Sequence, residues 1–153
     1  MCLLYPNMRA RKHIAVIGLC LLLAATNRFQ PVSSAQNASS SISDGIFNEE
    51  QAVRGAEQYR ARCASCHSND LRGNSNSPSL LGMSFMFVWE GRSLGELYDK
   101  MRREMPTDQP GSLTEQAYAD VLAFILASNE FPAGAAELIA DQSALDRITI
   151  SSQ

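Results

Sequence analysis

Three absences narrow the classes of protein to which this chain of 153 residues can belong. Its longest apolar run, residues 14–25, is shorter than the roughly 20 apolar residues that a helix needs to cross a bilayer. No alternating strand pattern and no internal repeat is present, so β-rich and repeat architectures are not indicated. No tract of basic residues follows residue 28, which removes the usual basis for binding nucleic acid or an anionic membrane.

The N-terminus has the pattern of a secretory signal peptide. Residues 9–13 are basic and precede the apolar run, and Ser33 and Ala35 are small residues where a signal peptidase needs them. We expect residues 1–35 to be removed and the remainder to be exported to the periplasm. The alternative is an uncleaved segment that anchors the chain to a membrane.

Cleavage after Ala35 would make the chain more acidic. It removes four of the 13 basic residues and none of the 16 acidic residues, so nine basic residues remain and the formal net charge is −7. Lys100 is then the only lysine. Such a chain cannot dock on a partner through a lysine-rich ring, and steering by its few arginines is screened within about 10 Å at 0.1 M salt.

Cleavage would also leave two cysteines and one histidine, all in the stretch CASCH, which contains Cys63, Cys66 and His67. Structural zinc needs four ligands, and no further Cys or His remains to complete the set. A thioredoxin-like thiol pair normally lies in a βαβ pattern, which is missing here. The third chemistry of this spacing is covalent haem attachment, in which two thiols bind the vinyl groups and the histidine binds the iron. The exported chain therefore favours haem c.

Helical periodicity predicts three main helices. The first covers residues 46–62 and leads directly into CASCH. The second begins after Ser93, with Glu96 as its capping-box partner, and ends before Pro106. The third begins near Thr114 and ends at about residue 128. Residues 68–82 are rich in Asn, Ser, Gly and Pro and are expected to form a long loop.

The chain resembles the class I c-type cytochromes over residues 47–138. Gly55 and Tyr59 match the small and aromatic positions of that family's first helix, and Phe124 matches the aromatic position of its last helix. The resemblance implies an all-α cytochrome c fold with three main helices around one covalently attached haem. Residues 85–106 and 110–134 are most similar to the cytochromes and cytochrome domains that accompany PQQ-dependent dehydrogenases.

PSLLG, residues 78–82, is similar to the family's P-x-L-x-G loop. By that resemblance the carbonyl of Pro78 accepts a hydrogen bond from His67, and Leu80 packs on the haem ring. Trp89 has two interpretations: its indole N–H binds a haem propionate, as the resemblance suggests, or it is simply a buried core residue.

The sixth iron ligand cannot be a second histidine. The candidates are Lys100, an open position, or one of four methionines: Met83, Met86, Met101 and Met105. Met83, Met86 and Met101 are interpreted as core or haem-wall residues. Met105 precedes Pro106, which disfavours helix at that position, and the pair matches the family's distal ligand.

The resemblance implies an electron carrier that accepts single electrons from a dehydrogenase of the PQQ type and passes them to a terminal oxidase or another cytochrome. A haem peroxidase or a haem-based sensor is the alternative, and it requires an open distal site. The expected organisation is a signal peptide (1–35), a flexible leader (36–45), a cytochrome c domain (46–131) and a loosely packed tail (132–153) with at most one helical turn.

Overall fold

The computed structural model describes residues 40–152, so residues 1–39 and 153 lie outside the described part. The described residues all belong to one compact unit. The predicted signal peptide, its cleavage site and the first four residues of the leader lie outside the described residues and stay predictions. No helix within residues 40–152 combines the length and apolar character that a membrane span requires.

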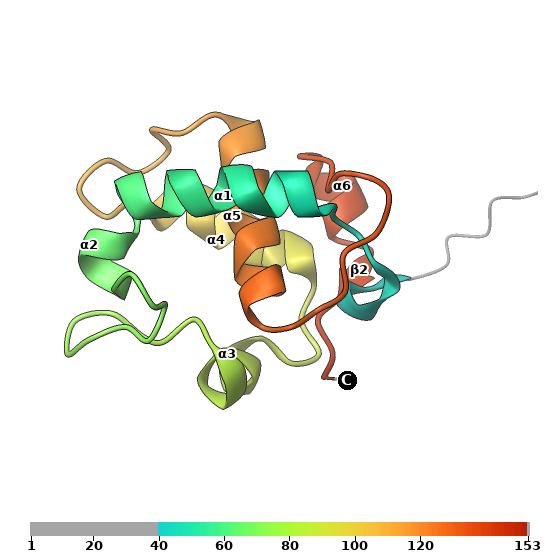
Figure 1. Cartoon of the computed structure of the whole chain (residues 1–153), viewed down its shortest axis with the longest axis horizontal. Helices are drawn as coiled ribbons and strands as arrows, with labels where there is room; N and C mark the ends of the chain where they lie inside the picture. Colours follow the sequence, from blue (N-terminus) through green and yellow to red (C-terminus); the bar gives the residue numbers. More distant parts are fainter. Residues whose placement is uncertain (1–39, 153) are drawn as a thin grey trace, which may run out of the picture. The chain divides into compact units, whose positions relative to one another are not determined.

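The fold is mostly helical, as the sequence predicts (Figure 1). Its elements in chain order are β1 (Ser40–Ser41), η1 (Ile42–Asp44), α1 (Glu49–Arg62), α2 (Ala64–His67), α3 (Gly82–Trp89), α4 (Leu94–Glu104), α5 (Glu115–Ser128), α6 (Gln142–Leu145) and β2 (Ile148–Thr149). The three predicted main helices are α1, α4 and α5. The one-turn α2 carries the CASCH motif, and α3 is a helix that the periodicity did not reveal.

Helices α1 and α5 cross in close contact, and Figure 1 shows α1 lying across α5. A glycine at the crossing makes this possible, since a Cβ on Gly55 would lie 1.8 Å from the carbonyl oxygen of Asp120. One turn further along α1, the ring of Tyr59 packs on that of Phe124 with 5.2 Å between centroids. The small and aromatic positions therefore form the crossing that the sequence resemblance implies.

Local polar groups set the starts of α4 and α5. The hydroxyl of Ser93 accepts a hydrogen bond from the N–H of Glu96 at 3.1 Å, and the hydroxyl of Thr114 accepts one from Ala117 at 3.2 Å. These caps satisfy N–H groups that have no partner inside the helix. The predicted capping box is only half formed, because the carboxylate of Glu96 pairs with Arg92 at 2.5 Å.

The prediction of a loosely packed tail over residues 132–153 is wrong. Leu138, Leu145 and Ile150 are buried, with at most 2% of their surface exposed. The fully buried amide of Gln51 on α1 holds the tail, since it donates to the carbonyl of Leu138 at 3.0 Å and accepts from its N–H at 2.7 Å. The apolar residues of the tail thus complete the core, although their irregular spacing does not indicate a helix or a strand. The predicted short helical turn corresponds to α6.

The prediction of a flexible leader over residues 36–45 is also wrong for the described residues 40–45. Ile42 is fully buried, and Ser41 caps η1. β1 pairs in parallel with β2 of the tail, and Ile150 exchanges backbone hydrogen bonds with Gly91 and Arg92. Serine-rich composition suggested a solvated segment, whereas the segment acquires its backbone partners from residues about 110 positions away.

Helix α3 corrects the interpretation of Met83 as a core residue. Its inward face buries Phe85 and Trp89, while Met83 is 91% exposed and Phe87 is 92% exposed. Met86 is partly buried against the core. Nearly every residue of this helix is apolar, so hydrophobicity alone could not indicate which side faces inward.

Candidate functional site: a cavity between α2 and α4

A cavity of about 670 Å³ lies inside the described part of the chain, with largely apolar walls formed by residues of α1 to α5 and the loops between them. All seven residues predicted to bind the cofactor line it: Cys63, Cys66, His67, Pro78, Leu80, Trp89 and Met105. Pocket volumes of 300–1,000 Å³ are typical of sites for small molecules and cofactors.

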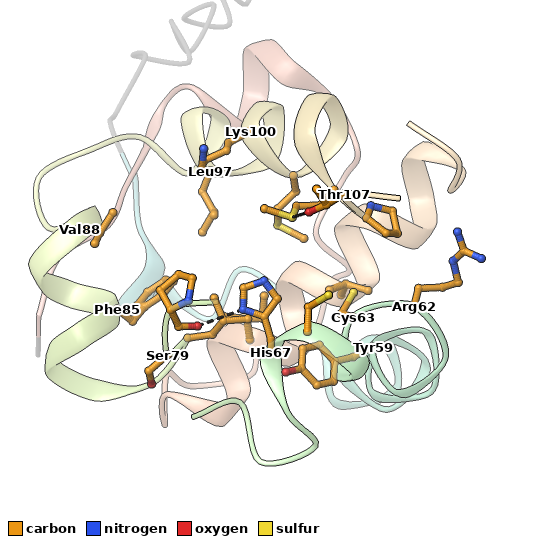
Figure 2. Close-up of a pocket in the computed structure, with 18 of the residues that line it drawn as sticks. Tyr59, Arg62, Cys63, His67, Ser79, Phe85, Val88, Leu97, Lys100 and Thr107 are labelled. Carbon is orange, nitrogen blue, oxygen red and sulfur yellow. Dashed lines mark hydrogen bonds between the residues drawn. The ribbon is translucent and has the colours of Figure 1, made fainter. Parts of the chain in front are cut away.

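His67 is fixed by a hydrogen bond on one side of its ring. Its Nδ1 lies 3.0 Å from the carbonyl oxygen of Pro78, and the residue is 9% exposed. A carbonyl oxygen can only accept, so Nδ1 carries the proton, and in the neutral ring Nε2 keeps a free lone pair. Figure 2 shows the ring of His67 pointing into the cavity, with Leu97 and Thr107 across from it. The imidazole is therefore oriented as a metal ligand would be.

The loop before Pro78 is held tightly against α2. The N–H of Gly73 donates to the carbonyl of His67 at 2.9 Å, and Asn74 pairs with Ser77 through two backbone hydrogen bonds. Gly73 has φ of +70°, and a Cβ there would lie 2.3 Å from the oxygen of Ser77. This turn requires glycine, and it sets the position of the Pro78 carbonyl.

The two cysteines are free thiols on the wall of the cavity. Burial raises the pKa of Cys63 to about 11, so this thiol is protonated at neutral pH in the haem-free chain. A buried, protonated thiol is a poor nucleophile for disulfide exchange. This argues against Cys63, but not against the exposed Cys66, as an attacking thiol. Within residues 40–152, no three His, Cys, Asp or Glu side chains gather as a metal site.

Met105 follows the last residue of α4 in an extended conformation, as Pro106 predicts. The hydroxyl of Tyr118 donates to its carbonyl at 2.6 Å, and the hydroxyl of Thr107 donates to its sulfur at 3.6 Å. Figure 2 places Thr107 on the side of the cavity opposite His67. The thioether therefore lines the cavity from a backbone position that Tyr118 holds in place.

The other candidate ligands divide into three groups. Met101 lines the cavity and is 9% exposed, as a wall residue is expected to be. Met83 and Met86 are not among the residues that line it. Lys100 lies at the cavity and pairs with Glu104 one helical turn away.

The contacts of three residues at the site were not found from the sequence. Thr107 contacts the sulfur of Met105, Tyr118 contacts its carbonyl, and Arg62 donates to Gln109 and Ser112 at 3.0 Å each. The two hydrogen bonds of Arg62 connect the end of α1, next to Cys63, to the loop that follows Met105. Thr107 stands two residues from Met105 and could have been suspected, whereas the contacts of Tyr118 and Arg62 cross the fold.

Trp89 lies at the end of α3, where it lines the cavity and is 6% exposed. The guanidinium of Arg92 lies 4.5 Å from the centroid of its ring. Such a cation–π contact places a positive charge beside the indole at this end of the cavity. The position is compatible with both sequence interpretations, burial in the core and contact with a cofactor carboxylate.

Part of the chain that contains this site is similar to a known protein family. Residues 50–125 match the family model described as cytochrome c oxidase, cbb3-type, subunit III. None of the curated proteins is significantly similar in sequence to the chain. A solved structure, the sulfane dehydrogenase SoxCD from Paracoccus pantotrophus, is similar with a TM-score of 0.45 and 20% identity, and the match covers 74% of this chain. It covers 60% of the solved chain.

The fold and the cavity define an all-α protein with a mostly apolar internal cavity of the size that a cofactor needs. The family match supports a class I c-type cytochrome, and a cytochrome c domain implies binding of haem c. The residues present fit that group, since the cavity brings two free thiols, an oriented imidazole and a thioether to mostly apolar walls.

Proposed function

We propose that this chain is a monohaem electron carrier of the periplasm, which exchanges single electrons with protein partners and has no substrate of its own. The observation that carries the proposal is the cavity that holds Cys63, Cys66, His67 and Met105 together, with the imidazole oriented by Pro78. Bound haem c supplies a one-electron Fe(III)/Fe(II) couple.

Cys63 and Cys66 hold the ring covalently in this proposal. Each thiol would add across one vinyl group, with its sulfur bonded to one vinyl carbon and its hydrogen to the other. The S–H bond and the vinyl π bond would be lost, and no oxidant would be needed. The two side chains are suited to this because both line the cavity and neither is in a disulfide.

His67 and Met105 would bind the iron of that haem. Nε2 of His67 is the ring nitrogen left free by the bond to Pro78, and the Met105 thioether reaches the cavity from the loop after α4. A methionine ligand opposite histidine raises the reduction potential. The thioether would also occupy the coordination site that a peroxidase or sensor leaves open, so the chain's own residues favour electron transfer over that alternative.

We also propose an electron donor and an electron acceptor for this chain. A dehydrogenase, of the PQQ type by sequence resemblance, donates the electrons, and a terminal oxidase or another cytochrome accepts them. The signal-peptide pattern of residues 1–35 supports export to the periplasm. Contact with the membrane is expected only if that segment is retained.

Haem content and attachment test the proposal directly. The full chain is expressed with the cytochrome c maturation machinery, and its visible spectrum, its iron content and the behaviour of the haem on extraction with acidified acetone are measured. We expect one iron per chain, haem that stays with the protein, and a spectrum that added cyanide changes only slowly. Haem that extracts freely contradicts covalent attachment, and rapid binding of peroxide or cyanide favours the open-site alternative.

Single variants assign the attachment. Cys63→Ala and Cys66→Ala are each expected to keep one thioether bond, which shifts the pyridine haemochrome band, and the double variant is expected to release all haem. Ser65→Ala, between the two cysteines, is the matched control and should leave the spectrum unchanged.

A further inference from the structure

The outward side of α3 carries an apolar surface that the fold leaves uncovered. Met83 and Phe87 lie one helical turn apart with 91% and 92% of their surface exposed, and Val88 beside them is 48% exposed. These three residues are called the α3 face below. The other large hydrophobic residues that are exposed within residues 40–152 are Val53 on α1 and Ile139 in the tail. Isolated exposed residues are ordinary, but three on one short helix form a patch.

The helix segment that carries the α3 face has no charged residue, and where Val88 borders α4 the charges balance. The pocket beside Val88 is lined by three basic and three acidic residues: Arg92, Lys100, Arg103, Glu96, Asp99 and Glu104. Residues 73–89 hold no Asp, Glu, Lys, Arg or His, although the chain carries 29 acidic and basic residues in all. A partner that docks there meets neither attraction nor repulsion from the segment itself. The face therefore fits an uncharged, apolar surface on the partner, since a charged group buried against it would lose hydration without gaining a counter-charge.

The α3 face is continuous with the wall of the cofactor cavity. Val88 belongs to the face and also lines the cavity, and Phe85 and Trp89 line the cavity from the inner side of the same helix. Figure 2 shows Val88 and Phe85 at one side of the cavity. A partner on the face is thus separated from the cavity by a single helix, whose diameter is about 10 Å with its side chains.

The area of the α3 face is that of a transient contact. A large side chain contributes about 150–250 Å² when it is fully buried, so the three exposed fractions together offer about 400 Å². A stable dimer buries about 800 Å² on each subunit, whereas electron-transfer encounters lie at the low end of interface sizes. The area is too small for a lasting contact between two copies, and two copies of an acidic chain also repel each other.

From these observations we infer that the α3 face is the docking surface for a transient electron-transfer partner whose own contact surface is apolar and uncharged. This inference rests on the proposed electron-carrier function and specifies where its partner binds. Phe87 is the centre of the contact because it is the largest and the most exposed of the three side chains.

Stopped-flow electron transfer to two protein probes of contrasting surface tests this assignment. One probe is a blue-copper carrier whose copper edge is surrounded by uncharged apolar residues, and the other is a lysine-ringed cytochrome c. Phe87→Glu and Met83→Glu are compared with Val53→Glu, which places the same charge at an exposed apolar position on α1. Phe87→Leu keeps the face apolar.

We expect Phe87→Glu to slow transfer to the apolar probe by tenfold or more, with Phe87→Leu and Val53→Glu within twofold of the parent. The haem spectrum and the reduction potential of all four variants should equal those of the parent. Equal effects of Phe87→Glu and Val53→Glu, or no effect of either, would overturn the assignment. A parent that reduces neither probe contradicts the electron-carrier function itself, whereas a parent that reacts normally while Phe87→Glu has no effect contradicts only the docking surface.

Three further outcomes assign the face to another occupant and overturn the inference. Phe87-dependent binding to phosphatidylcholine vesicles indicates a membrane contact. A Phe87-dependent dimer in sedimentation equilibrium indicates a second copy. A loss of binding of the dye ANS in the full chain, compared with a chain that begins at Gln36, indicates that the N-terminal segment covers the face.

Discussion

Nδ1 of His67 lies 3.0 Å from the carbonyl oxygen of Pro78, across a turn that only glycine at position 73 permits. The bond fixes the tautomer of the ring and makes the imidazole a stronger donor. It links the motif that carries the thiols to a loop eleven residues further along the chain, so the backbone of that loop influences the electronic character of the site.

The turn at Gly73 is the first point at which this relationship can be tested. Gly73→Ala places a Cβ 2.6 Å from the carbonyl carbon of Pro78 and should push that group away from His67. We expect a higher reduction potential, because a weaker imidazole donor stabilises Fe(III) less, and a loss of about 1 kcal/mol in the free energy of unfolding from the hydrogen bond.

Gly91→Ala is the matched control for Gly73→Ala. Gly91 has φ of +78°, close to the +70° of Gly73, but a Cβ there meets nothing within 4 Å. Both variants therefore lose a similar amount of stability from placing alanine in a left-handed backbone conformation. Only Gly73→Ala should change the reduction potential in protein-film voltammetry. A potential that shifts equally in both variants contradicts the role assigned to the turn.

Met105 and Met101 should respond differently to truncation. Met105→Ala removes a thioether ligand, so we expect a lower reduction potential, loss of the weak sulfur-to-iron band of the oxidised spectrum, and faster binding of added imidazole. Met101→Ala removes a buried wall residue and should cost about 2–5 kcal/mol of stability while the band persists. The opposite pattern would identify Met101 as the ligand.

Thr107 should tune the sulfur of Met105. Its hydroxyl donates to that sulfur at 3.6 Å, which withdraws electron density from the sulfur and makes it a weaker donor to Fe(III). We expect Thr107→Val, which keeps the shape and removes the donor, to lower the reduction potential and cost less than about 1 kcal/mol in stability. Thr107→Ser keeps the hydroxyl and should retain the parent potential. If Ser and Val shift the potential alike, the hydrogen bond is not the cause.

The C-terminal segment should contribute strongly to stability. Ile150→Ala empties a fully buried position beside the loop that follows Trp89, so we expect a loss of about 2–5 kcal/mol in urea unfolding. Ile139→Ala makes the same chemical change at a residue that is 68% exposed and should stay within about 0.5 kcal/mol of the parent. Equal effects of the two changes would instead support a loosely packed tail.

Local signals in the sequence were sufficient for the main helices. Ser93 and Thr114 cap α4 and α5, and Pro106 ends the helical conformation before Met105. These features depend on neighbours within four residues, so the local sequence is sufficient to specify them. The spacing of Cys63, Cys66 and His67 is local in the same sense, and it identified the class of cofactor before any fold was known.

Other features depend on residues distant in the chain. The orientation of α3 could not be predicted because almost all of its residues are apolar, and only packing places Phe85 inward and Phe87 outward. The tail was predicted to be loosely packed because its buried residues follow no helical or strand period. Its partners, Gln51 and β1, lie far away in the chain.

The sequence by itself determined that this chain is helical, that its chemistry is concentrated in CASCH, and that Met105 leaves its helix at Pro106, because each of these properties is a matter of near neighbours. Only the tertiary structure decided which methionines line the cavity and that Phe87 remains on the surface. These depend on how helices pack, and close packing selects one arrangement from several that the same pattern of apolar residues allows.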